Sequence, residues 1–198
     1  MPHIAQRRTC RPSPGAPARA LARIAGAALL NAVVLSAGVG AGDALAQGAA
    51  EIHFSPAENL ERIDLDLIAA ARTRIDMAAF FLTDRAVADA LVAAARRGVA
   101  VRLVVDGGEK QAYDRLSPLG ASVRRKPEKP IMHMKAYVVD GQLVRTGSAN
   151  FSVNALKHQD NDLIILRDAQ AAARYGAQFE RIWENAVPAL EAASAGPH

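Results

Sequence analysis

The chain has 198 residues, and 51% of them are hydrophobic, which is ample for the packed core of one or two domains. Its formal net charge of +4 is unevenly distributed. Residues 1–46 hold five arginines and one aspartate, so the remaining 19 basic and 19 acidic residues cancel. The net charge therefore comes from the N-terminal segment. It gives no evidence that the folded part binds nucleic acid or any other acidic partner.

Residues 1–46 have the pattern of an export signal. An arginine-rich start is followed by an apolar run over 24–39 and by a small-residue cleavage pattern at 44–46. The alternative is an uncleaved membrane anchor, but Asn31 and many Ala and Gly residues weaken the run as a permanent span. We therefore predict a cleaved signal peptide and a periplasmic or secreted protein. Cys10 is the only cysteine, so the mature chain would form no disulfide.

The first half of the folded part predicts alternating strands and helices. Short runs rich in apolar residues indicate strands, and apolar residues at helical spacing indicate helices. The predicted order is strand 51–54, helix 58–71, strand 74–82, helix 84–97 and strand 99–105. Thr83 or Asp84 caps the second helix, and Gly98 ends it. The order of strand, helix and strand implies parallel pairing in an α/β layer.

The next segment predicts a loop from Asp106, a short helix at 111–116 and a strand at 122–126. Four basic residues gather around the end of that strand, and they are Arg124, Arg125, Lys126 and Lys129. Two interpretations stay open for them: a solvated loop between two prolines, or a patch that tracks phosphates beside an active site. Few aromatic residues are interleaved, so the stretch gives no support for base stacking.

Residues 132–146 predict a β-hairpin. Residues 132–139 alternate as in a strand, Asp140-Gly141 is a hairpin turn signal, and residues 143–146 form the returning strand. Beyond the hairpin we expect a turn or short helix at 151–156, a strand at 160–166, a helix at 169–187 and a disordered tail at 191–198.

The hairpin brings four chemically useful side chains to one place. His133 and Lys135 are two residues apart on a strand and point to the same face. The returning strand delivers Ser148 and Asn150 near them, and Gly147 lets the backbone approach a ligand closely. Lys135 supplies a positive charge, and Ser148 and Asn150 supply neutral donors for a phosphate in its transition state. A neutral His133 can attack phosphorus and form a phosphohistidine.

The spacing H-x-K-x4-D-x6-G-S-x-N resembles the HKD motif of the phospholipase D superfamily. The matching residues are His133, Lys135, Asp140, Gly147, Ser148 and Asn150. The resemblance extends over residues 51–187 and is nearest to the small, single-motif bacterial endonucleases of that superfamily. It implies one domain over residues 47–190, with a mixed, largely parallel β-sheet flanked by helices on both faces. It also implies phosphodiester hydrolysis without a metal or other cofactor.

Two aspartates are candidate catalytic residues, each with a structural alternative. Asp140 belongs to the motif, but an Asp-Gly pair in a hairpin turn explains it without chemistry. Similar proteins carry a glutamate that orients the catalytic histidine at the position of Asp160, so this sequence has a side chain one methylene shorter there. The resemblance gives Asp160 that orienting role, and the alternative is an ordinary aspartate at the start of a strand.

The sequence holds one copy of the motif, whereas larger members of the superfamily bring two copies into one active site. There, one histidine attacks phosphorus and the other protonates the leaving oxygen. We therefore expect a homodimer with both His133 side chains at the two-fold axis. The histidines His53, His158 and His198 show no metal-ligand spacing, so no structural zinc is predicted.

These observations predict an exported phosphodiesterase. A nonspecific endonuclease acting on DNA or RNA is the first choice, because of the small size and the single motif. A phospholipase D acting on glycerophospholipids is the second, and a retained anchor would favour it by placing the site at a lipid surface. An inactive dimeric nucleic-acid-binding module is the third, and the intact His133, Lys135, Ser148 and Asn150 argue against it.

Overall fold

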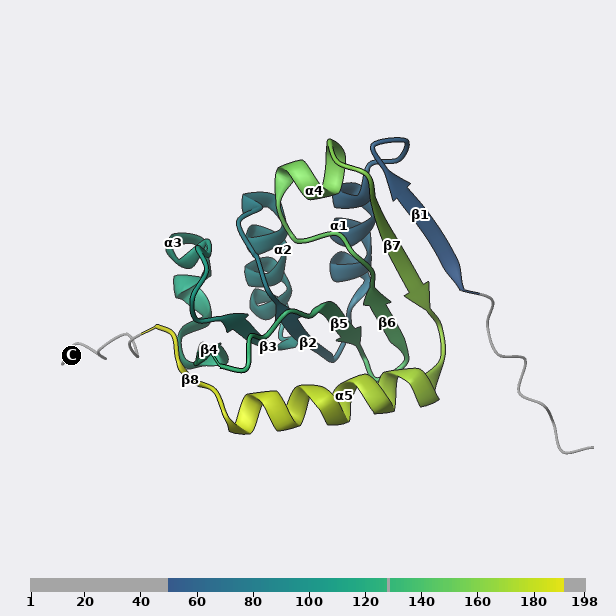
Figure 1. Ribbon diagram of the computed structural model, residues 1–198. Coiled ribbons are helices and arrows are strands. Elements are labelled where there is room, and N and C mark those ends of the chain that lie inside the picture. The colour runs from purple at the N-terminus through teal and green to yellow at the C-terminus, as the bar shows by residue number, and fades with distance from the viewer. Residues whose placement is uncertain (1–49, 128, 191–198) are drawn as a thin grey trace, which may run out of the picture. The chain divides into compact units, whose positions relative to one another are not determined.

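A computed structural model describes residues 50–127 and 129–190 of the chain (Figure 1). Its elements, in chain order, are β1 (Glu51–Ser55), α1 (Leu60–Ala70), β2 (Arg74–Ala79), α2 (Arg85–Arg96), β3 (Ala100–Asp106), α3 (Tyr113–Leu116), the 3-10 helix η1 (Ser117–Ser122), β4 (Val123–Lys126), β5 (Lys135–Val139), β6 (Leu143–Thr146), α4 (Val153–Lys157), β7 (Asn161–Leu166), α5 (Ala169–Glu184) and β8 (Val187–Pro188). The predicted signal peptide at 1–46 and tail at 191–198 lie outside the described residues.

The strands form one mixed sheet in the order β1-β7-β6-β5-β2-β3-β4-β8. β2 pairs in parallel with β3 as predicted, and β3 pairs in parallel with β4. The first strand differs from the prediction, because β1 pairs antiparallel with β7 and is not a neighbour of β2. The other five pairs are antiparallel: β1 with β7, β7 with β6, β6 with β5, β5 with β2, and β4 with β8. A mixed α/β sheet is therefore confirmed, but the prediction that it is largely parallel is wrong.

Helices cover both faces of the sheet, as predicted. In Figure 1, α1, α2, α3 and α4 lie on one side of the strands and α5 lies alone on the other. The larger core lies under α1 and α2 and includes Leu60, Ile68 and Leu91, all fully buried. A smaller core lies under α5, where Phe179 and Ile182 pack on Ala78 and Val104 of the sheet. Among the described helices, none combines the length and apolar character needed to span a membrane.

Side-chain caps set where the helices begin. The carboxylate of Asp84 accepts hydrogen bonds from the first turn of α2, as the sequence predicts, and Asn59 and Asp168 do the same for α1 and α5. The last predicted helix ends earlier than expected, at Glu184, because Asn185 closes it and residues 187–188 pair with β4 instead.

The strand predicted from Met132 begins three residues later, at Lys135. The backbone N–H of Met132 does not join the sheet but donates to the buried carboxylate of Asp106 at 3.0 Å. His133 therefore lies in a short extended segment before β5 rather than on the strand. The segment that holds His133 lies at the end of the sheet where β2 and β3 finish, because Ala79, the last residue of β2, is in register with Lys135.

Candidate active site

His133 and Lys135 converge as the spacing predicted. The Nζ atom of Lys135 lies 3.3 Å from each ring nitrogen of His133 and donates to the His133 carbonyl oxygen at 2.9 Å. His133 is exposed and Lys135 is half-buried. Burial lowers the pKa of Lys135 below its ordinary value, because an ammonium loses hydration there. An accessible imidazole thus stands beside a partly dehydrated positive charge.

Phe80 forms the apolar wall of this pair. Its ring lies 4.4 Å from the imidazole of His133, centroid to centroid, and 4.8 Å from the Nζ atom of Lys135. The backbone N–H of Phe80 donates to Met134 O at 2.8 Å, which ties the end of β2 to the segment before β5. In the sequence, Phe80 is only one apolar residue of the predicted strand 74–82. Only the pairing of β2 with β5 reveals the contact.

Ser148 lies in the loop after β6 and is held by β7. Its hydroxyl donates to Asn161 Oδ1 at 3.1 Å and accepts from the Asp162 N–H at 2.9 Å. Its own N–H donates to Asp162 Oδ1 at 3.2 Å. Asn161 and Asp162 were missed as partners of this loop, although they directly follow Asp160 in the sequence.

Gly147 allows close contact with the neighbouring strand, and its expected role in letting a ligand approach stays a prediction. Its φ angle is 134°, and a Cβ atom placed there would lie 2.4 Å from the carbonyl oxygen of Asp162. No L side chain fits that space without moving the backbone. The glycine therefore lets the loop with Ser148 close against β7.

Asn150 presents an unused buried acceptor. Its Oδ1 atom is buried and receives no hydrogen bond from the residues that the structure describes. A buried amide oxygen without a donor is costly, so a bound group or water that donates there would be favoured. Among the predicted phosphate-binding residues, Asn150 thus has a buried side-chain oxygen, Oδ1, that lacks a partner within the described residues.

Asp160 lines the same hollow as Ser148. It is exposed, immediately precedes β7, and lines a hollow of about 290 Å³ with Phe54, Ser148 and Asp162 among others. Both residues are described by the structure, and the Asp160 carboxylate makes no hydrogen bond to His133 there. The orienting role of Asp160 stays a prediction.

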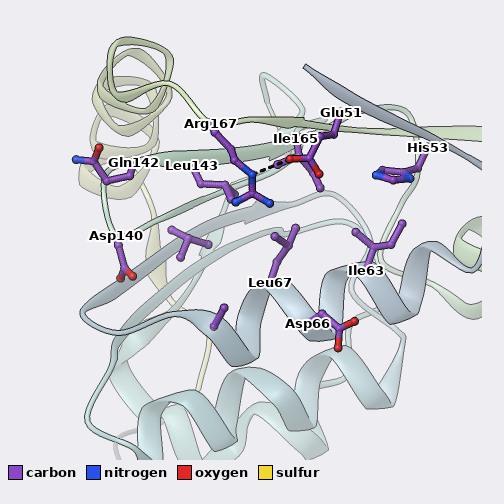
Figure 2. Close-up of a pocket in the computed structure, with 12 residues that line it drawn as sticks. Glu51, His53, Ile63, Asp66, Leu67, Asp140, Gln142, Leu143, Ile165 and Arg167 are labelled. Carbon is purple, nitrogen blue, oxygen red and sulfur yellow. Dashed lines mark hydrogen bonds and ion pairs between the residues drawn. The ribbon is translucent and has the colours of Figure 1, made fainter. Parts of the chain in front are cut away.

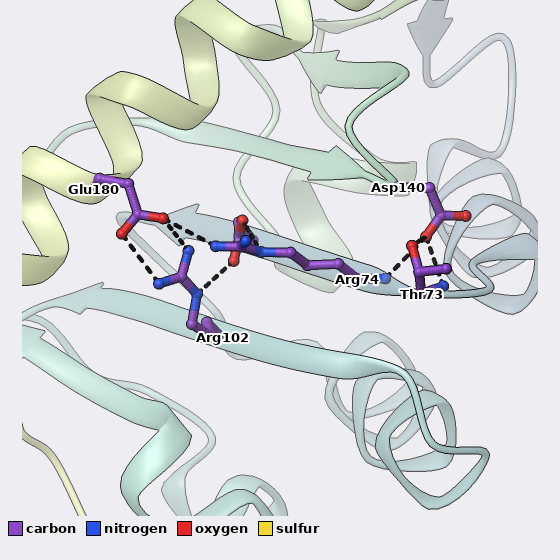
Figure 3. Close-up of polar contacts among 6 residues, drawn as sticks. Thr73, Arg74, Arg102, Asp140 and Glu180 are labelled. Atoms are coloured by element: carbon purple, nitrogen blue, oxygen red, sulfur yellow. Dashed lines mark hydrogen bonds and ion pairs between the residues drawn. The ribbon is translucent and has the colours of Figure 1, made fainter.

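Asp140 lies at the opposite end of β5 from Lys135. Its Oδ1 atom accepts from Thr73 N at 2.8 Å, Thr73 Oγ1 at 2.9 Å and Arg74 N at 2.9 Å, and Oδ2 accepts from Arg72 N at 3.0 Å. Figure 3 shows the carboxylate over the start of β2. Partial burial acts to raise its pKa, but these hydrogen bonds hold it below its ordinary value. This geometry favours the structural alternative for Asp140, and its catalytic role stays a prediction.

A hollow of about 580 Å³ is lined in part by Asp140, and His133 is not among its lining residues. Figure 2 shows the residues that line it. Its floor is apolar, with Leu67 and Ile165, and its charged rim is already paired. Arg167 Nε lies 2.7 Å from Glu51 Oε1, as Figure 2 shows. The rim thus offers few free groups for chemistry.

The basic residues before His133 are partly engaged. Arg124 donates to Trp183 O at 2.9 Å and lies 4.1 Å from the Trp183 ring centroid. Lys126 donates to Pro130 O. Arg125 and Lys129 are exposed, so these two are the members of the group that a polyanion could meet.

Comparison with known proteins agrees with the motif. The family described as "Cardiolipin synthase, PLD-like domain" matches residues 65–183, which is more than half of the chain. A mitochondrial cardiolipin hydrolase of Xenopus laevis is 33% identical over 132 residues, covering 65% of this chain and 62% of that protein. A phospholipase D of Rickettsia bellii is 32% identical over 126 residues, covering 62% of this chain and 63% of that protein. The chain thus spans less than two thirds of the length of these relatives.

Solved structures share the fold. The crystal structure of Nuc, a phospholipase D family member from Salmonella typhimurium, has a TM-score of 0.65 and 26% identity, and the match covers 72% of this chain and 99% of Nuc. NucT from Helicobacter pylori has a TM-score of 0.63 and 20% identity, with coverage of 71% and 98%. The predicted resemblance is confirmed. With a family match over residues 65–183 and a fold shared with Nuc, the chain belongs to the phospholipase D superfamily.

Proposed function

We propose that this chain is a phosphodiesterase that forms a covalent phosphohistidine on His133. The observation that carries the proposal is the exposed imidazole of His133 with the Lys135 ammonium 3.3 Å from both ring nitrogens. A fixed positive charge next to a nucleophile suits a substrate that gains negative charge in the transition state. The accessible position of His133 leaves room for an incoming phosphorus and for a second subunit.

The reaction has two displacements. In the first, a ring nitrogen of His133 attacks phosphorus, the bond from phosphorus to the leaving oxygen breaks, and that oxygen takes a proton from a second imidazole. In the second, water attacks the phosphohistidine, the same second imidazole accepts its proton, and the nitrogen–phosphorus bond breaks. In this proposal Lys135 and Asn150 stabilise the phosphate oxygens, and Ser148 joins them once its hydroxyl turns away from Asn161.

The second imidazole comes from a second copy of the chain in this proposal. The sequence has one motif copy, and His133 is exposed just before β5, so a two-fold axis there would bring two imidazoles together. Mixing wild-type subunits with an excess of His133→Asn subunits should leave mixed dimers with less than about 1% of wild-type activity. Full activity per wild-type site in isolated mixed dimers would contradict a shared active site.

Nucleic acid is the substrate that we propose first. The support is the likeness to small single-motif bacterial endonucleases and the exposure of Arg125 and Lys129 just before the catalytic segment. Contacts to phosphate carry no base information, so we expect cleavage of DNA or RNA without sequence preference.

A glycerophospholipid is the alternative that specific observations favour. Two relatives are named mitochondrial cardiolipin hydrolase and phospholipase D. Two large apolar side chains also lie exposed near the site: Phe54, 56% exposed, lines the hollow with Ser148, and Ile131, 64% exposed, is two residues from His133. Apolar side chains at a lipid interface are favourable, whereas nucleic acid gives them little to bury.

One experiment separates these substrates. Purified protein from residue 47 onward is incubated with plasmid DNA, RNA, phosphatidylcholine vesicles and cardiolipin vesicles, each with and without a chelator, beside the His133→Asn variant. We expect cleavage of nucleic acid by the wild-type protein alone, unaffected by chelator. Lipid cleavage alone would support the phospholipase, whereas DNA binding without any cleavage would support a binding module. Loss of cleavage with chelator would contradict the metal-free mechanism.

Export to the periplasm is also part of the proposal, and its support is the pattern of residues 1–46. Expression of the full chain in a bacterial host, followed by fractionation and N-terminal sequencing, tests it. We expect a periplasmic protein that begins at Gln47, whereas a chain retained in the membrane with its first residues intact would indicate an anchor.

A further inference from the structure

A fully buried ion pair lies behind the candidate active site. Arg145 of β6 and Asp64 of α1 are both 0% exposed. The guanidinium binds the carboxylate in a bidentate manner, with Nε to Oδ1 and Nη2 to Oδ2 both 2.9 Å. The hydroxyl of Tyr137 donates to the same Oδ1 at 2.8 Å.

The remaining guanidinium nitrogen links the segment that carries Lys135 to the segment that carries Asn150. Nη1 of Arg145 donates to the backbone carbonyl of Lys135 at 3.1 Å and to that of Ala149 at 3.2 Å. The guanidinium carbon also lies 4.4 Å from the ring centroid of Phe151. One side chain therefore contacts the residue that carries the catalytic ammonium and both neighbours of Asn150.

Stability alone gives a weak reason for this pair. Removing two charges from water costs several kcal/mol per ion, and the attraction between them roughly returns that cost. Well-packed apolar residues of similar size would stabilise the same space equally well or better. What they would lack is the planar fork of arginine, which fixes direction as well as distance.

We propose that Arg145, oriented by Asp64, is a positioning residue that holds Lys135 and Asn150 in register for one phosphate. The inference rests on the proposed function of that site. Lys135 opens β5 and Asn150 follows β6, so a small shift between these strands would change the spacing of the two residues. Nη1, shared between the two carbonyls, opposes that shift.

The test removes the polar cluster while leaving no buried charge unpaired. The variant Asp64→Leu/Tyr137→Phe/Arg145→Met replaces each member by an apolar residue of similar size. Arg102→Met is the matched control, because Arg102 also pairs with carboxylates, Asp76 and Glu180, but on the α5 face of the sheet (Figure 3). Arg145→Lys keeps the charge and loses the fork, and it serves if the triple variant fails to fold.

Three quantities are measured: kcat on a soluble phosphodiester, the Kd for inorganic phosphate, and Tm. We expect the triple variant to fold, with kcat about 100-fold lower and phosphate binding about tenfold weaker, because small displacements of catalytic groups cost that much. Arg145→Lys should lose about tenfold in kcat, and Arg102→Met should keep kcat within about twofold while its Tm falls.

Each failure has its own signature. A folded triple variant, or failing that Arg145→Lys, with wild-type kcat and phosphate affinity would overturn the positioning role and leave the proposed function standing. Wild-type protein that binds phosphate but cleaves nothing would remove the proposed function, and the phosphate affinities of the variants would then decide the positioning role. Wild-type protein that does neither would overturn both.

Discussion

The ring of Phe80 packs against the imidazole of His133, with ring centroids 4.4 Å apart and ring planes inclined at 55°. Phe80 follows the last residue of β2, so the proposed nucleophile is restrained by a residue 53 positions earlier in the chain. The contact limits the rotation of an exposed side chain that must attack in one direction.

Replacement of Phe80 by leucine should reduce kcat about tenfold, because the apolar bulk remains but the flat face that restrains His133 is lost. Steady-state kinetics on a soluble phosphodiester measure the effect. Phe81→Leu is the control, since Phe81 packs edge-on against Phe80, with centroids 4.8 Å apart, and should keep kcat within about twofold. Equal losses in both variants would argue against a specific role of the Phe80 ring.

Replacement of His133 by asparagine should abolish turnover, with a loss of at least about 1000-fold, because the nucleophile is removed. His133 is exposed, so Tm should change by less than about 2 °C. Thermal unfolding and the kinetic assay are run on the same preparation. Residual cleavage near the wild-type rate would show that another group attacks phosphorus.

Replacement of Asp140 by asparagine should lower stability and leave catalysis intact. The carboxylate accepts four hydrogen bonds from residues 72–74, and hydrogen bonds to a charged group contribute about 1.5–3 kcal/mol. Asparagine tolerates the positive φ of 53° at this position, so the backbone is kept. Urea unfolding should show a loss of about 1–3 kcal/mol. A large fall in kcat with unchanged stability would support a catalytic role instead.

The same aspartate predicts a pH dependence of stability. Its pKa in the folded chain lies below the ordinary value of 3.8, so the folded state binds its proton less readily than the unfolded state. This contribution is complete above the ordinary pKa and is lost as the pH falls through the folded pKa. Urea unfolding from pH 6 to pH 2.5 should therefore show a steeper acid loss for wild-type protein than for Asp140→Asn. Parallel curves would contradict the assignment.

Replacement of Gly147 by alanine should destabilise the loop and reduce activity. The new Cβ atom would lie 2.4 Å from the Asp162 carbonyl oxygen at a φ of 134°, so the backbone must move. We expect this shift to lower the free energy of unfolding by about 1–3 kcal/mol. Gly176→Ala is the matched control, because no atom lies within 4 Å of the added Cβ and alanine favours α5 by about 1 kcal/mol. Chemical unfolding of the pair should show shifts of opposite sign.

Local patterns in the sequence predicted most helices and strands and the pairing of His133 with Lys135. The spacing of His133 and Lys135 predicted a contact that the structure contains, because residues two apart along an extended chain share a face. The caps at Asp84 and the apolar spacing of α1, α2 and α5 are likewise local. Such periodicity depends only on residues close together in the sequence, so it can be recognised without knowledge of the fold.

Tertiary structure alone decided which distant residues support that site. Asp64 and Arg145 are 81 positions apart, and either one by itself resembles an ordinary charged residue of a helix or strand. Phe80, Asp106 and Asp162 reach the motif only because β2, β3 and β7 are placed around β5 and β6 in the sheet. The order of strands depends on the balance of many weak packing contacts between remote segments, and no single stretch of sequence carries that balance.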